Sequence, residues 1–215
     1  MHPDRIDRWG VIVVIAFTGP LAAAALLGCG TDTPNQDHTT TTVDAARTPP
    51  TGIRWWPFQG VDLPVTNQGP RTIEGAVASG FDHSPAGAAV AAIQATVRTS
   101  IATDGQWPQI GARMLAPGPA RDVWAVARAQ ISITAPIVDG APKILGYVLS
   151  RYTLDASEVD IYSLHPDNSL TLNHTTVLWQ HDDWRLALPD TVSATAPPVA
   201  AVAVTPPDLV VLTQR

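Results

Sequence analysis

The chain has 215 residues, a formal net charge of −6 and 15% charged residues, and Lys143 is its only lysine. This composition excludes a basic nucleic-acid-binding surface, because phosphate recognition needs clustered Lys and Arg side chains. Cys29 is the only cysteine, so no intramolecular disulfide can form and an apolar core must hold the fold together. The length allows one domain with flanking segments.

The first 28 residues have the pattern of an export signal. The uncharged stretch over residues 11–27 is short for a membrane span, and Pro20 interrupts it. It runs into Leu26-Leu27-Gly28-Cys29, the form of a bacterial lipobox, in which the cysteine is acylated and becomes the first mature residue. We therefore expect a lipoprotein signal peptide over 1–28 and lipid attachment at Cys29. In the alternative, the stretch is an uncleaved anchor helix and Cys29 has no role.

Both interpretations place the rest of the chain on the extracytoplasmic face of the cell membrane. Residues 29–54 include a run of four threonines at 39–42 and the segment Thr48-Pro49-Pro50-Thr51. This Thr/Pro-rich stretch has almost no bulky apolar residue to bury, so it cannot offset the entropy cost of ordering. We expect a disordered tether, followed by one α+β domain over 55–190.

The first half of that domain predicts a short strand and then helices. Residues 72–78 alternate weakly, as in a strand. Ser84 is a good N-cap, and Pro85 follows at the first helical position, where its missing N–H costs nothing. An apolar stripe then predicts a helix up to about Asp104; it comprises Val90, Ile93, Val97 and Ile101.

Two shorter helices are expected over 106–115 and 120–134. In the second, an apolar stripe recurs at helical spacing. This stripe comprises Val123, Trp124, Ala127 and Ile131.

The second half of the domain has the period of two that is typical of strands. Strands are expected over 143–154, 157–164, 170–180 and 184–188, joined by short turns into an antiparallel meander. Trp179 and Trp184 flank the last turn and are expected to pair across it. On the first strand, alternation puts Leu145, Tyr147 and Leu149 on one face and Ile144, Val148 and Tyr152 on the other. The predicted fold is α+β, with N-terminal helices packed on a curved antiparallel sheet.

The C-terminal stretch over 191–215 is rich in Pro and Val. Its apolar character leaves two interpretations open. It is either a loose tail or an extended arm that packs on this domain or on a partner.

Two resemblances follow from these segments. The helix-then-sheet layout and the hairpin over 177–186 resemble the nuclear-transport-factor-2-like (cystatin-like cone) superfamily, in which a terminal "W…DGDW.L" hairpin is common. More closely, Trp56-Pro57-Phe58-Gln59-Gly60-Val61-Asp62-Leu63-Pro64-Val65, Gln68-Gly69-Pro70 and Gly80-Phe81-Asp82-His83-Ser84-Pro85-Ala86-Gly87-Ala88 resemble an uncharacterised family of exported actinobacterial proteins. Those proteins are associated with integrative and conjugative elements. The resemblance implies an accessory envelope protein of a conjugative type IV secretion system.

The sequence offers little catalytic chemistry. The histidines after the tether are not spaced as a metal-ligand pair, and turn chemistry explains the acidic turns; these histidines are His83, His165, His174 and His181. His174 with Asp155 or Asp160 is the nearest approach to an acid–base pair, and nothing in the spacing requires it. We therefore expect no catalytic residue, no metal, no cofactor and no enzymatic activity.

Trp55, Trp56 and Phe58 stand beside the tether. They either cap the domain's own sheet or form a partner-binding motif, because Trp and Phe next to a linker are good interface anchors.

The function expected from the sequence is a non-enzymatic, membrane-anchored envelope lipoprotein with a protein partner and no nucleic acid. The alternative is a lipoprotein that binds a small ligand in a deep cavity on the concave face of the sheet.

Overall fold

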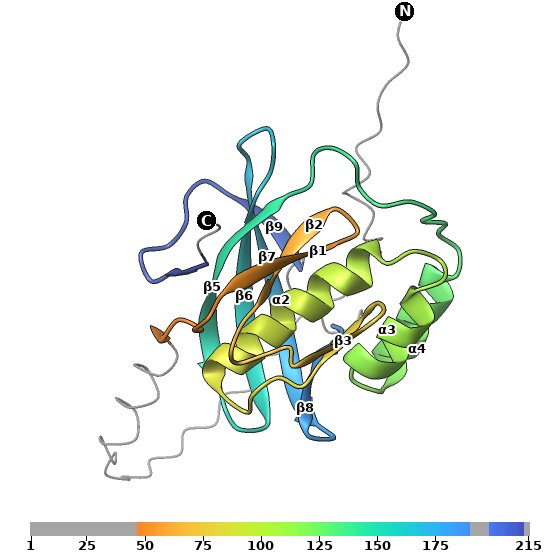
Figure 1. Cartoon of the computed structure of the whole chain (residues 1–215), viewed down its shortest axis with the longest axis horizontal. Coiled ribbons are helices and arrows are strands. Elements are labelled where there is room, and N and C mark those ends of the chain that lie inside the picture. Colours follow the sequence, from red (N-terminus) through yellow and green to blue (C-terminus); the bar gives the residue numbers. More distant parts are fainter. Residues whose placement is uncertain (1–46, 190–197, 213–215) are drawn as a thin grey trace, which may run out of the picture. The chain divides into compact units, whose positions relative to one another are not determined.

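The fold comes from a computed structural model that describes residues 47–189 and 198–212 (Figure 1). The expected signal peptide, Leu26, Leu27, Gly28 and Cys29 lie outside these ranges, as does the tether up to residue 46. The elements, in chain order, are β1 (Arg54–Phe58), β2 (Val61–Val65), β3 (Thr72–Glu74), β4 (Val77–Ser79), α2 (Pro85–Ile101), α3 (Trp107–Met114), α4 (Pro119–Arg128), β5 (Lys143–Tyr152), β6 (Ala156–Leu164), β7 (Leu170–Gln180), β8 (Asp183–Ala187), β9 (Val199–Val202) and β10 (Val210–Val211).

The α+β class and the antiparallel meander are confirmed. A six-stranded sheet has the order β10-β5-β6-β7-β8, and β9 pairs with β7 beside β8. The expectation of N-terminal helices is wrong, because two hairpins, β1–β2 and β3–β4, precede α2. Each hairpin is closed by a short turn. In β1–β2, Gln59 and Gly60 have φ of 51° and 91°, as in a two-residue type I′ turn. In β3–β4, the expected single strand over 72–78 folds back at Gly75.

Residues just ahead of 55 are held by defined contacts and β1 begins at Arg54, so the boundary expected for the tether at residue 54 is wrong. The Thr51 N–H donates to Gln68 Oε1 at 2.8 Å, and the Asn67 N–H donates to the Thr51 carbonyl at 2.8 Å. These bonds hold the chain in place just ahead of β1.

Helix α2 is the centre of the fold. The Ser84 Oγ accepts the Gly87 N–H at 3.1 Å, which confirms the predicted cap. Every residue from Gly87 to Ala95 is buried, because the helix packs against the large sheet and also against β2 and β4 (Figure 1). Its run of Ala and Gly makes it slim enough for that position, and a helix that is apolar all round belongs in an interior.

The interior of the large sheet is filled by its own side chains. The side chains facing α2 are almost fully buried, and they include Tyr147, Val159, Ile161, Val177 and Trp184. Trp179 pairs with Trp184 as predicted, with ring centroids 5.3 Å apart. This packing leaves the concave face closed by α2.

Two irregularities in β5 overturn its predicted faces. The register with β6 shifts between Ile144 and Gly146 and again between Leu149 and Arg151. Each extra residue reverses the alternation. Ile144 and Tyr152 therefore share the core face with Tyr147 and Leu149, where strict alternation put them on the opposite face.

Helix α4 is shorter than predicted, and only part of its apolar stripe is covered by other residues. It ends at Arg128, whose guanidinium is 4% exposed and donates to the Ala102 carbonyl at 2.7 Å and the Ile131 carbonyl at 2.5 Å. Trp124 packs towards α3, while Val123 and Ile131 are exposed. Arg128 is thus the buried residue of this helix, while its valines are exposed.

Of the two interpretations of the C-terminal stretch, the structure shows an arm that packs on its own domain. Strand β9 pairs with residues 170–173 of β7, and β10 pairs with Gly146 and Tyr147 at the opposite edge of the sheet. The chain between them crosses the sheet. Val210 and Leu212 are buried with the core, so residues 198–212 belong to the domain.

Candidate functional site

The segment Trp55-Trp56-Pro57-Phe58 forms β1, and its aromatic side chains have three different surroundings. Phe58 is buried, and the Arg98 guanidinium lies 4.4 Å from its ring centroid. Trp55 is half-buried against the core. Trp56 is 61% exposed. Phe58 and Trp55 therefore pack on the domain itself, as the first interpretation expects. Trp56 faces solvent and is left for the second interpretation, a partner-binding motif.

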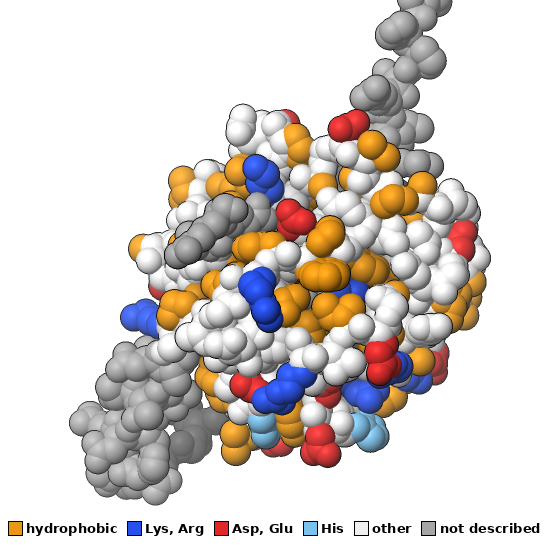
Figure 2. All heavy atoms as spheres, in the orientation of Figure 1, with side chains coloured by type: hydrophobic (Ala, Val, Ile, Leu, Met, Phe, Trp, Pro, Cys, Tyr) orange, Lys and Arg blue, Asp and Glu red, His pale blue; other side chains and the backbone are white. Residues whose placement is uncertain are grey.

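The exposed indole stands on a well-supported hairpin. In the β1–β2 ladder, Trp56 is opposite Leu63 and Phe58 is opposite Val61. Leu63 and Val61 are 0% and 1% exposed. In Figure 2, hydrophobic side chains gather over β1, β2 and α2 in the middle of the face shown. Trp56 is thus presented by a rigid element, as an interface anchor requires.

Two prolines modify the edges of this hairpin. Pro57 is opposite Asp62, and Pro64 is opposite Trp55. Proline has no N–H, so these must be the non-hydrogen-bonded pairs of the ladder. Neither proline interrupts the hairpin, and neither can donate a hydrogen bond to a strand added from outside.

Beneath the hairpin lies a buried polar network that sequence reasoning missed. Arg98 is 1% exposed; its Nε donates to Gln94 Oε1 at 2.7 Å and one terminal nitrogen donates to the Ala76 carbonyl at 2.8 Å. Gln94 Nε2 donates to the Pro64 carbonyl at 2.9 Å. Burial lowers the pKa of Arg98 to about 10. The sequence does contain a signal for this network: Gln94 and Arg98 lie four residues apart in a predicted helix that has no other charged residue.

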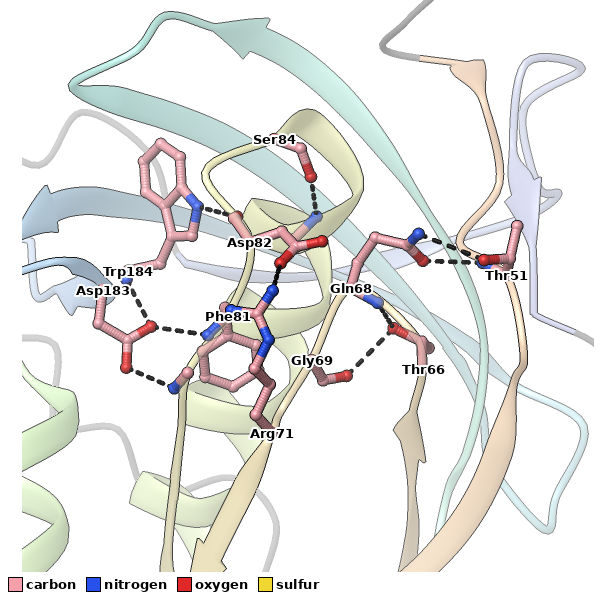
Figure 3. A network of polar contacts seen from close by, with 12 residues as sticks. Thr51, Thr66, Gln68, Gly69, Arg71, Phe81, Asp82, Ser84, Asp183 and Trp184 are labelled. Atoms are coloured by element: carbon pink, nitrogen blue, oxygen red, sulfur yellow. Dashed lines mark hydrogen bonds and ion pairs between the residues drawn. The ribbon is translucent and has the colours of Figure 1, made fainter.

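The segments Gln68-Gly69-Pro70 and Gly80–Ala88 meet at one junction (Figure 3). The Asp183 carboxylate accepts the backbone N–H groups of Gly80 at 2.8 Å and Phe81 at 3.0 Å. Trp184 Nε1 donates to the Asp82 carbonyl at 2.9 Å, and Arg71 pairs with the Asp82 side chain. These contacts tie β8 to the start of α2, which makes the junction structural.

His83 belongs to the same junction. Its ring stacks on Trp179 with centroids 3.9 Å apart and contacts the Leu154 carbonyl. Packing accounts for this histidine without a ligand.

His174 and Asp160 are brought together, with Nδ1 and Oδ1 2.6 Å apart. They are opposite each other on β7 and β6, at positions that alternate with the buried residues of both strands. The pair therefore lies on the outer face of the sheet, with His174 51% exposed, rather than in the interior. Asp155 is exposed in the β5–β6 turn.

Other kinds of site have little support in the described residues. Nowhere in 47–189 or 198–212 do three or more His, Cys, Asp or Glu side chains gather as ligands for a metal ion. Within the same ranges, no helix combines the length and apolar character needed to cross a bilayer. A shallow hollow of about 290 Å³ lies between α3 and α4, and it is lined by Trp107, Pro108, Gly111, Ala112, Arg121, Trp124 and Ala125.

Comparison with known families identifies the class of protein. Residues 22–204 match the family described as a domain of unknown function, DUF8175, and the chain belongs to this family. No curated protein and no solved structure matches the chain.

Proposed function

We propose that this chain is a non-enzymatic, membrane-anchored envelope lipoprotein that acts as an assembly or accessory component by docking a protein partner. The lipobox at Cys29 and the Thr/Pro-rich stretch after it support the anchor. The resemblance to exported actinobacterial proteins supports a conjugative type IV secretion system as the setting. Cys29 and residues 30–46 lie outside the described residues, so the anchor stays a prediction from the sequence.

One observation carries the docking role: Trp56 is 61% exposed on a hairpin whose other large apolar side chains are buried or half-buried. A large exposed indole costs solvation free energy and is the type of side chain that dominates protein interfaces. The hairpin is braced by Phe58 and Arg98, so the indole is held in place before a partner arrives. Such pre-organisation reduces the entropy lost on binding.

The alternative of a small-ligand carrier has less support. It needs a deep cavity on the concave face of the sheet, and that face is packed with Tyr147, Val159, Val177 and Trp184 beneath α2. The acid–base pair His174–Asp160 likewise lies away from the hollow between α3 and α4. Neither arrangement offers an enclosed site for a substrate.

Co-purification with a matched control tests the proposal. Tagged wild type, Trp56→Ala and Leu154→Ala are recovered from membranes in mild detergent, and bound proteins are quantified by mass spectrometry. The exposed fraction of Leu154 is 65%, similar to that of Trp56. Leu154 lies elsewhere in the fold, at the β5–β6 turn. We expect Trp56→Ala to reduce recovery of specific partners at least about tenfold, as for an interface anchor, and Leu154→Ala to retain them. Equal recovery with all three proteins would contradict the docking role.

A further inference from the structure

The exposed indole shares its face of the hairpin with a cation. Arg54 and Trp56 are two residues apart on β1, so both side chains point to the same face, about 7 Å apart along the strand. Phe58 shares this face and is buried, so the face is covered at its Phe58 end and exposed at Arg54 and Trp56. Arg54 is exposed. Asp62 is the nearest acidic residue in the hairpin, but it is opposite Pro57 and therefore on the other face.

Both arginines of this region lack an acidic partner. Neither Arg54 nor Arg98 forms an ion pair with any described residue. Arg98 is held by a carbonyl, an amide and the Phe58 ring, all of which are neutral. Its charge therefore remains uncompensated in a low-dielectric interior directly beneath β1, where charges act over longer distances than in water. The positive potentials of Arg98 and Arg54 add on the face that carries Trp56.

The mode of contact is also restricted. Pro57 and Pro64 each remove one of the two outward-facing N–H donors of their strand, which weakens strand addition. Recognition through side chains is therefore favoured. An arginine fork beside an indole fits a carboxylate next to an apolar side chain, since guanidinium and carboxylate form two parallel hydrogen bonds.

We propose that the Arg54–Trp56 face docks an acidic protein segment in which an Asp or Glu lies beside a bulky apolar residue. This inference rests on the docking role proposed above and adds the chemistry of the partner. The other negatively charged surface that could bind the Arg54–Trp56 face is an anionic membrane. It is disfavoured because the chain itself has a net charge of −6 and Lys143 is its only lysine, whereas membrane-binding surfaces are basic.

A charge-reversal selection tests the inference. Random 12-residue peptides displayed on phage are selected against the wild-type domain, Arg54→Glu and Trp56→Ala, and the recovered pools are sequenced. We expect the wild-type pool to be enriched at least about threefold in Asp or Glu next to an apolar residue. Arg54→Glu should shift the enrichment to Lys and Arg, and Trp56→Ala should abolish it. Arg151→Glu reverses an exposed charge on β5 and should give a pool like that of the wild type.

The outcomes separate this inference from the docking role. A pool that depends on Trp56 but is neutral or basic would overturn the acidic partner and leave docking intact. A pool that is the same for wild type and Trp56→Ala would count against both. Vesicles containing 30% anionic lipid are added in a parallel arm, and binding of these vesicles that is lost in Arg54→Glu would overturn the protein partner in favour of a membrane. Thermal unfolding confirms that each variant is folded.

Discussion

At the scale of single residues, the fold depends on a charge that has no counter-charge. Arg98 connects three elements: its own helix through Gln94, the turn between β3 and β4 through the Ala76 carbonyl, and β1 through the Phe58 ring. Burying a guanidinium is unfavourable unless its donors are satisfied. Neutral acceptors and an aromatic face satisfy them here. The side chain therefore stabilises the packing of the hairpins on α2.

Arg98→Ala should lower the free energy of unfolding by about 3 kcal/mol, because it leaves the Ala76 carbonyl and Gln94 Oε1 unpaired and opens a cavity over Phe58. Gln94→Ala should cost less, about 1–2 kcal/mol. Since the two side chains share one network, the double variant should cost at least about 1 kcal/mol less than the sum. Urea unfolding of the four proteins measures this coupling, and strict additivity would show that the two residues act independently.

Residue-scale features differed in how well the sequence predicted them. The Ser84 cap and the Trp179–Trp184 pair depend on neighbours in the chain, so local pattern was enough. The role of Arg98 depends on Phe58 and Ala76, which are far away in sequence. The contact of His174 with Asp160 was one of the pairs that the sequence allowed. The face of the sheet on which the pair lies could not be predicted, because it depends on the register of β7 with β6 and on the position of α2.

At the scale of elements, the C-terminal arm clamps the sheet from both edges. Leu212 N–H donates to the Leu145 carbonyl at 2.8 Å beside β10, and His174 N–H donates to the Pro198 carbonyl at 2.8 Å beside β9. Between these points Asp208 lies near Tyr162. Burial raises the pKa of Tyr162, and the carboxylates of Asp160 and Asp208 raise it further. At the β5 edge the arm pairs with Gly146 and Tyr147, which would otherwise be open to other strands.

Gly146→Ala should detach β10, because the new Cβ would lie 2.2 Å from the Val210 carbonyl oxygen. We expect a loss of about 2 kcal/mol in stability, since Val210 and Leu212 leave the core. Hydrogen exchange should be faster at residues 143–149 and 209–212 than in α2. Gly105→Ala is the control, because nothing lies within 4 Å of a Cβ at that position. Unchanged protection of residues 209–212 in Gly146→Ala would show that the arm tolerates the side chain.

Element boundaries show where sequence patterns are insufficient. Strand and helix periods located α2, α3 and β5 to β8 correctly, because each is long or strongly periodic. The hairpins β1–β2 and β3–β4 were missed for two different reasons. In β1–β2, Pro57 and Pro64 obscure the strand pattern, although both pair normally in non-hydrogen-bonded positions. In β3–β4, each strand has only three residues, too few to distinguish a hairpin from a single strand over 72–78. In β5, two register shifts changed the faces of Ile144 and Tyr152, and no alternation pattern contains that information.

At the scale of the whole molecule, the account joins an anchor to a docking face. Cys29 and the part of the tether up to residue 46 lie outside the described residues and stay predictions from the sequence. The domain has a filled interior, a C-terminal arm that pairs with both edges of its sheet, and a hairpin face on which an exposed indole and an exposed arginine stand together. These properties suit a domain that holds a partner near a membrane.

Photo-crosslinking in living cells tests this central claim most directly. A benzophenone amino acid replaces Trp56 or, as a control, Leu154, and irradiated cells are analysed for adducts. The account predicts one major protein adduct from position 56 in the membrane fraction, none from position 154, and a weaker adduct when Cys29→Ala also removes fatty-acid labelling. Adducts to lipid alone, or the same adducts from both positions, would contradict the account.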